Sequence, residues 1–304
     1  MSANSFDVVV IGAGPVGVSG AMAAAMMGAR TALVEREQHV GDAGINTGTI
    51  PSKTLRETAL ALSGLRSRQL YGVDLSLRRE ATIADFTRHR DNVMRGEQRR
   101  VESRLQGFGI ERITGTASFL HPHTVRVEAA DGTVTAIRGD RVLVATRSSP
   151  FHPAEFPFEH LRVHDSNEIL EIEALPRVLA VVGAGVIGCE YASTFAALGV
   201  EVPLVDGRGA LLPFLDGEIS HALTAAMLAL GVRLHFGERV ARCDAGIDDG
   251  IDLQLASGAS LACDDVLVCA GRTRKRCRST RHRTGARRSS PPPGRPRRSE
   301  RPAA

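Results

Sequence analysis

A glycine-rich pattern occurs twice in this chain of 304 residues, and the repetition constrains the fold more strongly than any other feature. The first copy, GAGPVG at residues 12–17, follows a β-branched run and opens an Ala-rich helical stretch. The second copy, GAGVIG at residues 183–188, lies in the same context. After each copy a further strand-like run ends in an acid, Glu35 or Asp206, at the same separation from the first glycine. This order predicts two strand-turn-helix-strand units.

The pattern G-x-G-x-x-G has a physical reason in units that bind dinucleotides. The first glycine makes a tight turn, the second lets the backbone approach a pyrophosphate, and the third allows the helix to pack closely on the strand. The helix N-terminus offers N–H groups to the phosphates, and the acid accepts a ribose hydroxyl. One copy alone could be a simple strand-to-helix connector, but both copies have the full context. We therefore predict an α/β fold with two Rossmann-like domains.

The pattern stays α/β as far as Arg272. Further helices are predicted at residues 52–68, 83–106 and 218–230. We expect one domain over residues 1–150, a second over 151–272, and a disordered Arg/Pro/Ser-rich tail over 273–304, which has no apolar periodicity. Predicted strands lie at residues 110–119, 124–129, 141–145, 232–236, 251–255 and 265–270.

The net charge of +4 suggests nucleic acid as a partner only until its distribution is examined. Residues 273–304 carry 12 Lys and Arg and one acid, so the other 272 residues hold 26 bases against 33 acids. The body is acidic, and nucleic acid is a candidate partner for the tail alone. No run of eighteen apolar residues indicates a membrane span, so we expect a cytoplasmic protein.

The cysteines are spaced irregularly, and neither a C-x-x-C pair nor a metal-ligand spacing occurs. Their odd number is typical of reduced cytosolic thiols, so we expect most of them to be small core residues and no metal to be bound. They are Cys189, Cys243, Cys263, Cys269 and Cys277.

The stretch GDAGINTGTIPSKTLRE at residues 41–57 resembles the signature of the two-dinucleotide flavoprotein disulfide reductases. In that family two cysteines separated by four residues form a redox disulfide over the flavin, whereas Gly44 and Thr49 stand at these positions here. A thiol relay is therefore excluded at this site. The form GTIPSKTLRE, with threonine for the second cysteine, is similar to the soluble, Si-specific pyridine nucleotide transhydrogenases of the same family. Further similar stretches lie at residues 115–119, 121–125, 181–193 and 205–220.

The resemblance covers residues 5–272 and implies two cofactor sites. Residues 1–150 would form the first part of an FAD-binding domain, and residues 151–272 would bind NAD or NADP. For the nicotinamide nucleotide the implied residues are Gly183, Gly185, Gly188, Asp206 and Arg208. For FAD they are Gly12, Gly14, Gly17, Glu35, Arg36, Gly41, Gly44 and Lys53, and Gly115, Thr116, Ala145, Thr146 and Gly271 complete the cofactor-binding set.

The resemblance also assigns Lys53, Glu190 and Thr49 to the reacting centre. Lys53 and Glu190 would form an ion pair near the reactive edge of the flavin, and Lys53 is the only lysine in the first 272 residues. A compact ammonium can approach the flavin where a planar guanidinium would not fit equivalently. The alternatives are that Lys53 is a solvated residue of a first helical turn, that Glu190 complements its helix N-terminus, and that Thr49 caps the following helix.

Asp206 and Arg208 suggest that both nicotinamide nucleotides are accepted. The Asp206 carboxylate can accept a hydrogen bond from an NAD ribose hydroxyl, and the Arg208 guanidinium can pair with the extra phosphate of NADP. The alternative is that Arg208 is a solvated loop charge.

Three features depart from the family pattern. Arg147 stands where family members have the glycine of an Ala-Thr-Gly turn on FAD, so its side chain threatens that approach. Pro203 lies inside a predicted strand, where the missing N–H would cost a ladder bond. After Arg272 neither the family's second flavin motif nor its dimer-forming interface domain can be read, and we hypothesise a truncation by a changed reading frame near Thr273.

These features favour an oxidoreductase that exchanges hydride between NADPH and NAD through bound FAD. Its partners would be small nicotinamide nucleotides, and the homo-oligomer typical of the family would lack its interface domain. One alternative is a catalytically impaired fragment that binds FAD or NAD(P). A less favoured one is an oxidoreductase similar to dihydrolipoamide dehydrogenase but without the redox disulfide.

Overall fold

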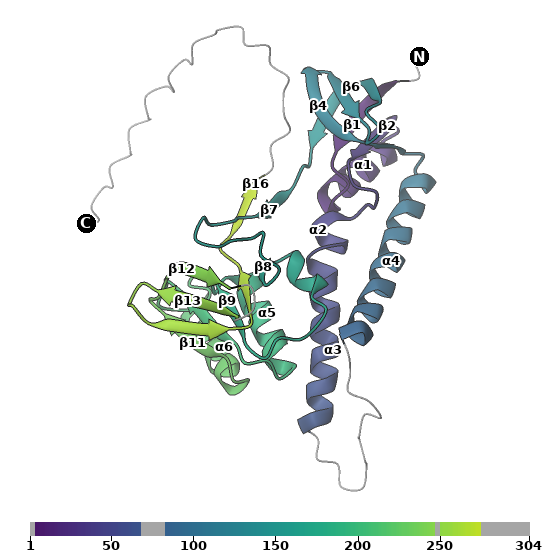
Figure 1. Cartoon of the computed structure of the whole chain (residues 1–304). Coiled ribbons are helices and arrows are strands. Elements are labelled where there is room, and N and C mark those ends of the chain that lie inside the picture. Colours follow the sequence, from purple (N-terminus) through teal and green to yellow (C-terminus); the bar gives the residue numbers. More distant parts are fainter. Residues whose placement is uncertain (1–3, 68–82, 247–249, 275–304) are drawn as a thin grey trace, which may run out of the picture.

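The computed structural model describes residues 4–67, 83–246 and 250–274, and these residues form two α/β units, each with its own sheet (Figure 1). The repeated glycine pattern therefore predicts the fold class correctly, since each copy lies between a strand and a helix of a Rossmann-like unit. Cys277 and the tail from residue 275 lie outside the described residues.

The first unit is built on a six-stranded sheet of order β3-β2-β1-β6-β5-β4. Its first strand, β1 (Ser5–Ile11), leads into α1 (Pro15–Met26) and returns as β2 (Thr31–Glu35), and β1 lies parallel to β2 and to β6. The central strands are apolar on both faces, because helices cover one side and further strands the other. The remaining strands are β3 (Glu111–Thr114), β4 (Thr116–His121), β5 (Thr124–Glu128) and β6 (Val134–Val144).

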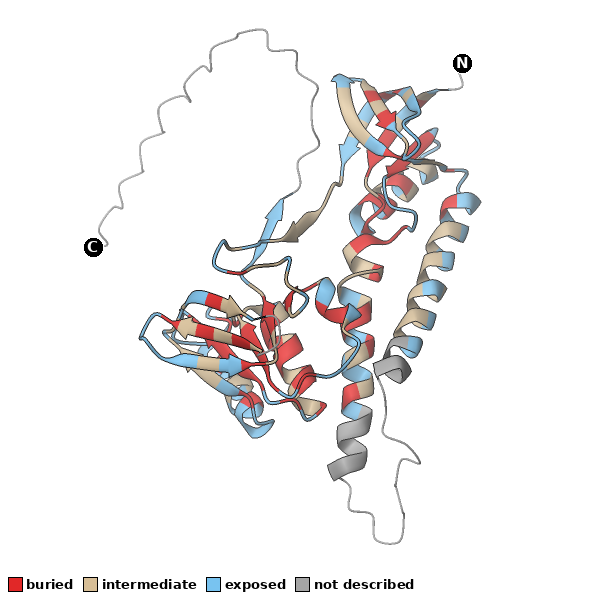
Figure 2. Cartoon of the chain, viewed as in Figure 1, coloured by how far each residue is buried: buried red, intermediate tan, exposed pale blue. Residues whose placement is uncertain are grey.

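The second unit is built on a five-stranded parallel sheet of order β11-β10-β9-β15-β8. Here β9 (Leu179–Val182) leads into α5 (Val186–Ala197) and returns as β10 (Pro203–Asp206). Figure 2 shows the buried residues gathered in these strands and on the inner sides of the helices. The other elements are β8 (Val163–Asp165), the 3-10 turn η1 (Glu168–Glu171), α6 (Gly217–Ala229), β11 (Arg233–Phe236) and β15 (Asp265–Val268), with an antiparallel sheet of β12 (Val240–Ala245), β13 (Ile251–Leu255) and β14 (Ser260–Cys263).

Helices and a short strand pair join the two units. After α2 (Asp42–Ile45), the long helix α3 (Thr49–Ser67) packs against α4 (Ile83–Gly107) of the first unit and against α5 of the second. The strand β7 (Ser148–Pro150) pairs antiparallel with β16 (Arg272–Arg274), and Figure 1 shows this ribbon passing between the sheets. No helix within the described ranges is long and apolar enough to span a bilayer.

Several element boundaries differ from the sequence-based expectation. Gly115 divides the predicted strand 110–119 into β3 and β4, because its φ of +155° lies in a range that L side chains rarely adopt. Pro203 is the first residue of β10 rather than an interior one, a position where a missing N–H is tolerated. Thr273 and Arg274 belong to β16, so the described fold extends two residues past the predicted start of the tail.

The two glycine turns have nearly the same geometry. Gly12 has a φ of +105° and Gly183 a φ of +106°, both in the left-handed region that favours glycine. A methyl group on Gly17 or Gly188 would lie 1.8 Å from the carbonyl oxygen of Gly12 or Gly183, respectively. The helix therefore touches the turn backbone directly, and only glycine permits this contact.

We expect Gly188→Ala to lower the free energy of unfolding by about 3 kcal/mol or more, because the added methyl group must push the helix away from the turn. Gly96→Ala is the matched control, since no described atom lies within 4 Å of its methyl position inside α4. That variant should be slightly stabilised, by about 0.5–1 kcal/mol. Urea unfolding followed by circular dichroism measures both. Equal midpoints for Gly188→Ala and the parent chain would contradict the close contact.

Candidate functional site

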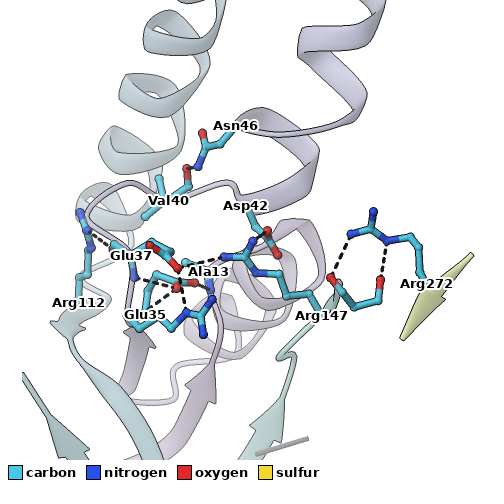
Figure 3. A network of polar contacts seen from close by, with 11 residues as sticks. Ala13, Glu35, Glu37, Val40, Asp42, Asn46, Arg112, Arg147 and Arg272 are labelled. Atoms are coloured by element: carbon cyan, nitrogen blue, oxygen red, sulfur yellow. Dashed lines mark hydrogen bonds and ion pairs between the residues drawn. The ribbon is translucent and has the colours of Figure 1, made fainter. Parts of the chain in front are cut away.

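Each unit places an acid directly against its glycine turn. Glu35, at the end of β2, accepts the Ala13 N–H through Oε2 at 2.6 Å (Figure 3). Asp206, at the end of β10, accepts the Ala184 N–H through Oδ2 at 2.5 Å. Both acids are buried. The predicted acids therefore occupy equivalent places in the two units, beside the start of the following helix.

The carboxylate of Asp206 also holds Arg208. The backbone N–H and Nε of Arg208 donate to Asp206 Oδ1 at 2.8 Å each, and Nη2 donates to Oδ2 at 2.6 Å. Burial opposes ionisation of Asp206, but the hydrogen bonds from Arg208 and Ala184 outweigh it, so the pKa of Asp206 lies below its ordinary value. The Arg208 side chain remains 47% exposed, which leaves its outer face open to solvent.

A cavity of about 240 Å³ lies between the two units and contains all three residues assigned to the reacting centre. Lys53 Nζ lies 3.9 Å from Glu190 Oε1, across the contact between α3 and α5. The hydroxyl of Ser52 donates to the same Glu190 oxygen at 3.0 Å. Glu190 is thus held from α3, while Lys53 is 63% exposed and faces the cavity.

Thr49 and Gly44 explain why this cavity contains no redox disulfide. Thr49 lines the cavity and is the first residue of α3. Gly44 lies in α2, and a methyl group there would lie 2.6 Å from Cγ of Pro15. No thiol lines the cavity among the residues that the structure describes.

The four described cysteines are neutral thiols. Burial raises the pKa of Cys189 and of Cys243 to about 11, and that of Cys263 and of Cys269 to about 12. Three of them are buried, which confirms that most are core residues. A thiolate nucleophile is therefore not available from them near neutral pH.

The other residues predicted to bind cofactor lie in three places. The Ala145 N–H donates to the Ile11 carbonyl at 2.8 Å, and Ala145 borders the first glycine turn. The Gly115 N–H donates to the carbonyl of Glu35 at the end of β2, also at 2.8 Å. Gly271, with a φ of +111°, lies where the chain leaves the second sheet for β16. Gly41 and Thr146 also lie at the first glycine turn, because the Gly41 N–H donates to the Ala13 carbonyl at 2.8 Å and Thr146 directly follows Ala145. At the surface, Thr116 starts β4 and is exposed, and Arg36 pairs with Glu37.

Arg147 has the backbone conformation of a glycine and contacts a residue that could not be identified from the sequence. Arg147 has a φ of +59°, so the backbone does adopt a conformation that favours glycine. Its guanidinium forms an ion pair with Asp42, whose own φ is +46°, and lies 4.0 Å from Glu37 (Figure 3). Asp42 is buried and belongs to the same resembling signature as Gly44. Nothing local in the sequence connects it with Arg147, which lies more than a hundred residues further along.

Residues 6–282 match the family described as pyridine nucleotide-disulphide oxidoreductase. A soluble pyridine nucleotide transhydrogenase of Mycobacterium tuberculosis is 41% identical over 270 residues, covering 88% of this chain and 58% of that protein. One from Salmonella choleraesuis is 38% identical over 268 residues, covering 88% and 57%. The chain therefore spans less than two thirds of the length of these relatives.

Solved structures agree with the fold. The HOCl-induced flavoprotein disulfide reductase RclA of Escherichia coli, in its Cu(II) complex, superposes with a TM-score of 0.76 at 26% identity. The match covers 88% of this chain and 57% of that structure. LpdA of Mycobacterium tuberculosis gives a TM-score of 0.78 at 25% identity, with 87% and 58% covered.

Proposed function

The chain belongs to the pyridine nucleotide-disulphide oxidoreductase family, and on this premise we propose that it transfers hydride between NADPH and NAD through a bound FAD. The observation that carries the proposal is the cavity between the units, which joins Lys53, Glu190 and Thr49 and is lined by no described thiol. Dinucleotide chemistry in this cavity must therefore proceed without a disulfide. The names of the two transhydrogenases described above support the same assignment.

The residues of the first unit suit a flavin dinucleotide. The turn at Gly12 brings the backbone within contact distance of Ala145, which leaves no room for a side chain beneath a pyrophosphate. We assign acceptance of a ribose hydroxyl to Glu35, whose carboxylate lies against the glycine turn. We assign residues 1–150 to the FAD domain and residues 151–272 to the NAD(P) domain, with Gly183, Gly185, Gly188 and Asp206 holding the nicotinamide nucleotide. When bound, FAD would supply the two-electron acceptor between two nicotinamide rings.

The side chains of the cavity orient the reactants and provide charge. The Lys53 ammonium is a cation at the cavity, and it favours the build-up of negative charge there during hydride transfer. Glu190 pairs with this charge from α5, and the Ser52 hydroxyl donates to the same Glu190 oxygen, so Glu190 acts as a positioning residue. Thr49 occupies the place of a thiol without its reactivity. We place the reaction in the cytoplasm, in keeping with relatives that are named soluble transhydrogenases.

The proposal is tested first by the visible spectrum of the purified chain. We expect a flavin band that NADPH bleaches without oxygen and that added NAD restores, because the cavity serves both half-reactions. Lipoamide and glutathione disulfide should not be reduced, since Gly44 and Thr49 replace the cysteines. A chain that takes up no FAD, or whose flavin NADPH leaves oxidised, would contradict the proposed function. The chain would then be an impaired nucleotide-binding member of its family.

Replacing Lys53 tests the role of its charge. We expect Lys53→Met to slow flavin reduction by NADPH by about tenfold or more, with FAD content nearly unchanged, because a preorganised charge is lost from the cavity. Arg56→Met, which removes an exposed cation further along the same helix, is the matched control. Stopped-flow absorbance measures the rate. Equal slowing in both variants would mean that the reduction rate depends on the total positive charge of α3 and not on the position of Lys53.

Arg208 is the proposed reader of the NADP phosphate. We expect Arg208→Ala to weaken NADPH binding about tenfold or more and to change NADH binding little, since only NADPH offers a ribose 2′-phosphate to the guanidinium. Arg233→Ala, which breaks a surface ion pair with Glu201 just before the adjacent strand β10, is the control. Equilibrium titration by nicotinamide fluorescence gives both affinities. Equal losses for NADH and NADPH would make Arg208 a structural partner of Asp206 only.

A further inference from the structure

Asp42 and Arg147 share an uncommon feature besides their ion pair. Among the described residues only three that are not glycine have a positive φ, and two of them are Asp42 and Arg147. Left-handed backbone is uncommon for such residues. Each of the two residues therefore carries its charge on a backbone conformation that favours glycine, and the two charges form an ion pair. The pair is 5% and 23% exposed at its two side chains, so it lies largely out of water.

The carboxylate of Asp42 lies at the entrance to α1. Gly14 is the N-cap of α1, and a methyl group placed on it would lie 3.2 Å from Asp42 Oδ2. The second unit has the same backbone at Gly185, the N-cap of α5, yet no described atom lies within 4 Å of its methyl position. The two dinucleotide units thus differ at one point. Besides its acid at the glycine turn, the first unit has the Asp42 carboxylate beside Gly14, whereas no described atom takes the corresponding place beside Gly185.

This place is chemically a phosphate site. A helix N-terminus attracts anions through its N–H groups and its dipole, and the glycine turn brings the backbone close. A guanidinium binds a carboxylate and a phosphate with the same two-pronged geometry. The Asp42 carboxylate therefore stands in for a phosphate group, and Arg147 already faces it from the opposite loop (Figure 3).

We propose that Arg147 binds the diphosphate of the dinucleotide in the first unit, and that Asp42 is an internal anion which the diphosphate displaces. The inference rests on the proposed use of FAD and adds a specificity-determining residue to that site. Arg147 is then a ligand of the phosphates, although it stands in place of a glycine that the family packs on FAD. The exchange replaces one anion with another at the same guanidinium, and no covalent bond changes.

The two partners should have opposite effects on FAD affinity. Asp42→Asn removes the competing charge and keeps a residue that tolerates left-handed backbone, so FAD should bind about tenfold more tightly. Arg147→Gly removes the guanidinium and relieves the backbone, so FAD should bind about tenfold more weakly. Quenching of flavin fluorescence on the flavin-stripped full chain measures both. Riboflavin, which has no phosphate, should respond to neither substitution.

Several outcomes would overturn the inference. Tighter FAD binding by Arg147→Gly would mean that the guanidinium only obstructs the site. Weaker FAD binding by Asp42→Asn would make the ion pair a purely structural contact, and so would equal effects on FAD and riboflavin. NADH affinity should be unchanged in both variants, which confines the effect to the first unit. If Asp42→Asn unfolds, Asp42→Gly takes the same backbone without strain and should show the same gain in affinity.

The binding test separates this inference from the proposed function. Flavin affinity is measured without hydride transfer, so a chain that binds FAD but fails to oxidise NADPH would refute the proposed function and leave the Asp42 result intact. A chain in which neither the parent nor Asp42→Asn binds FAD at any concentration tested would overturn both proposals.

Discussion

The contact between the third glycine of each fingerprint and the carbonyl of the first determines where everything else in the site can lie. In both units a methyl group would be 1.8 Å from that oxygen, so helix and turn are in direct backbone contact. This contact fixes the helix N-terminus over the end of the sheet. It also brings Ala13 and Ala184 within reach of the acids Glu35 and Asp206. A local steric constraint thus produces two equivalent helix N-termini, each with a carboxylate of the chain beside it.

The second constraint is the packing of α3 between the units. Its first turn supplies Ser52 and Lys53, while α5 supplies Glu190, so the ion pair exists only because the two helices touch. The α5 helix is in turn positioned by the glycine turn of the second unit. The cavity is therefore assembled from both units, and a shift of either helix would separate Lys53 from Glu190. Neither unit forms this cavity by itself.

The sequence predicts those parts of the fold and site that depend on neighbours along the chain. The glycine turns, their flanking strands and the acids Glu35 and Asp206 are encoded within about thirty residues of one another, the span of one βαβ unit, and the structure has them where the pattern indicates. The division at Gly115 and the position of Pro203 at a strand start were not predicted, because strand ends depend on pairing with distant segments. Lys53 and Glu190 could be connected only through a family resemblance, since 137 positions separate them.

The ion pair between Asp42 and Arg147 could not be predicted from any pattern in the sequence. Asp42 and Arg147 each have a charged side chain on left-handed backbone, which is unfavourable when either residue is considered alone. Together the two charges neutralise each other at the end of a helix, so each residue makes the other tolerable. The balance has a consequence for the two sites. Under the proposed exchange, a dinucleotide would bind in the first unit only to the fraction of molecules whose Asp42 has left Arg147, and its apparent affinity would be reduced by that fraction. No such carboxylate would compete beside Gly185 in the second unit. A diphosphate can still prevail over a single carboxylate, because it offers more charge and more acceptor oxygens to the same guanidinium and the same helix end.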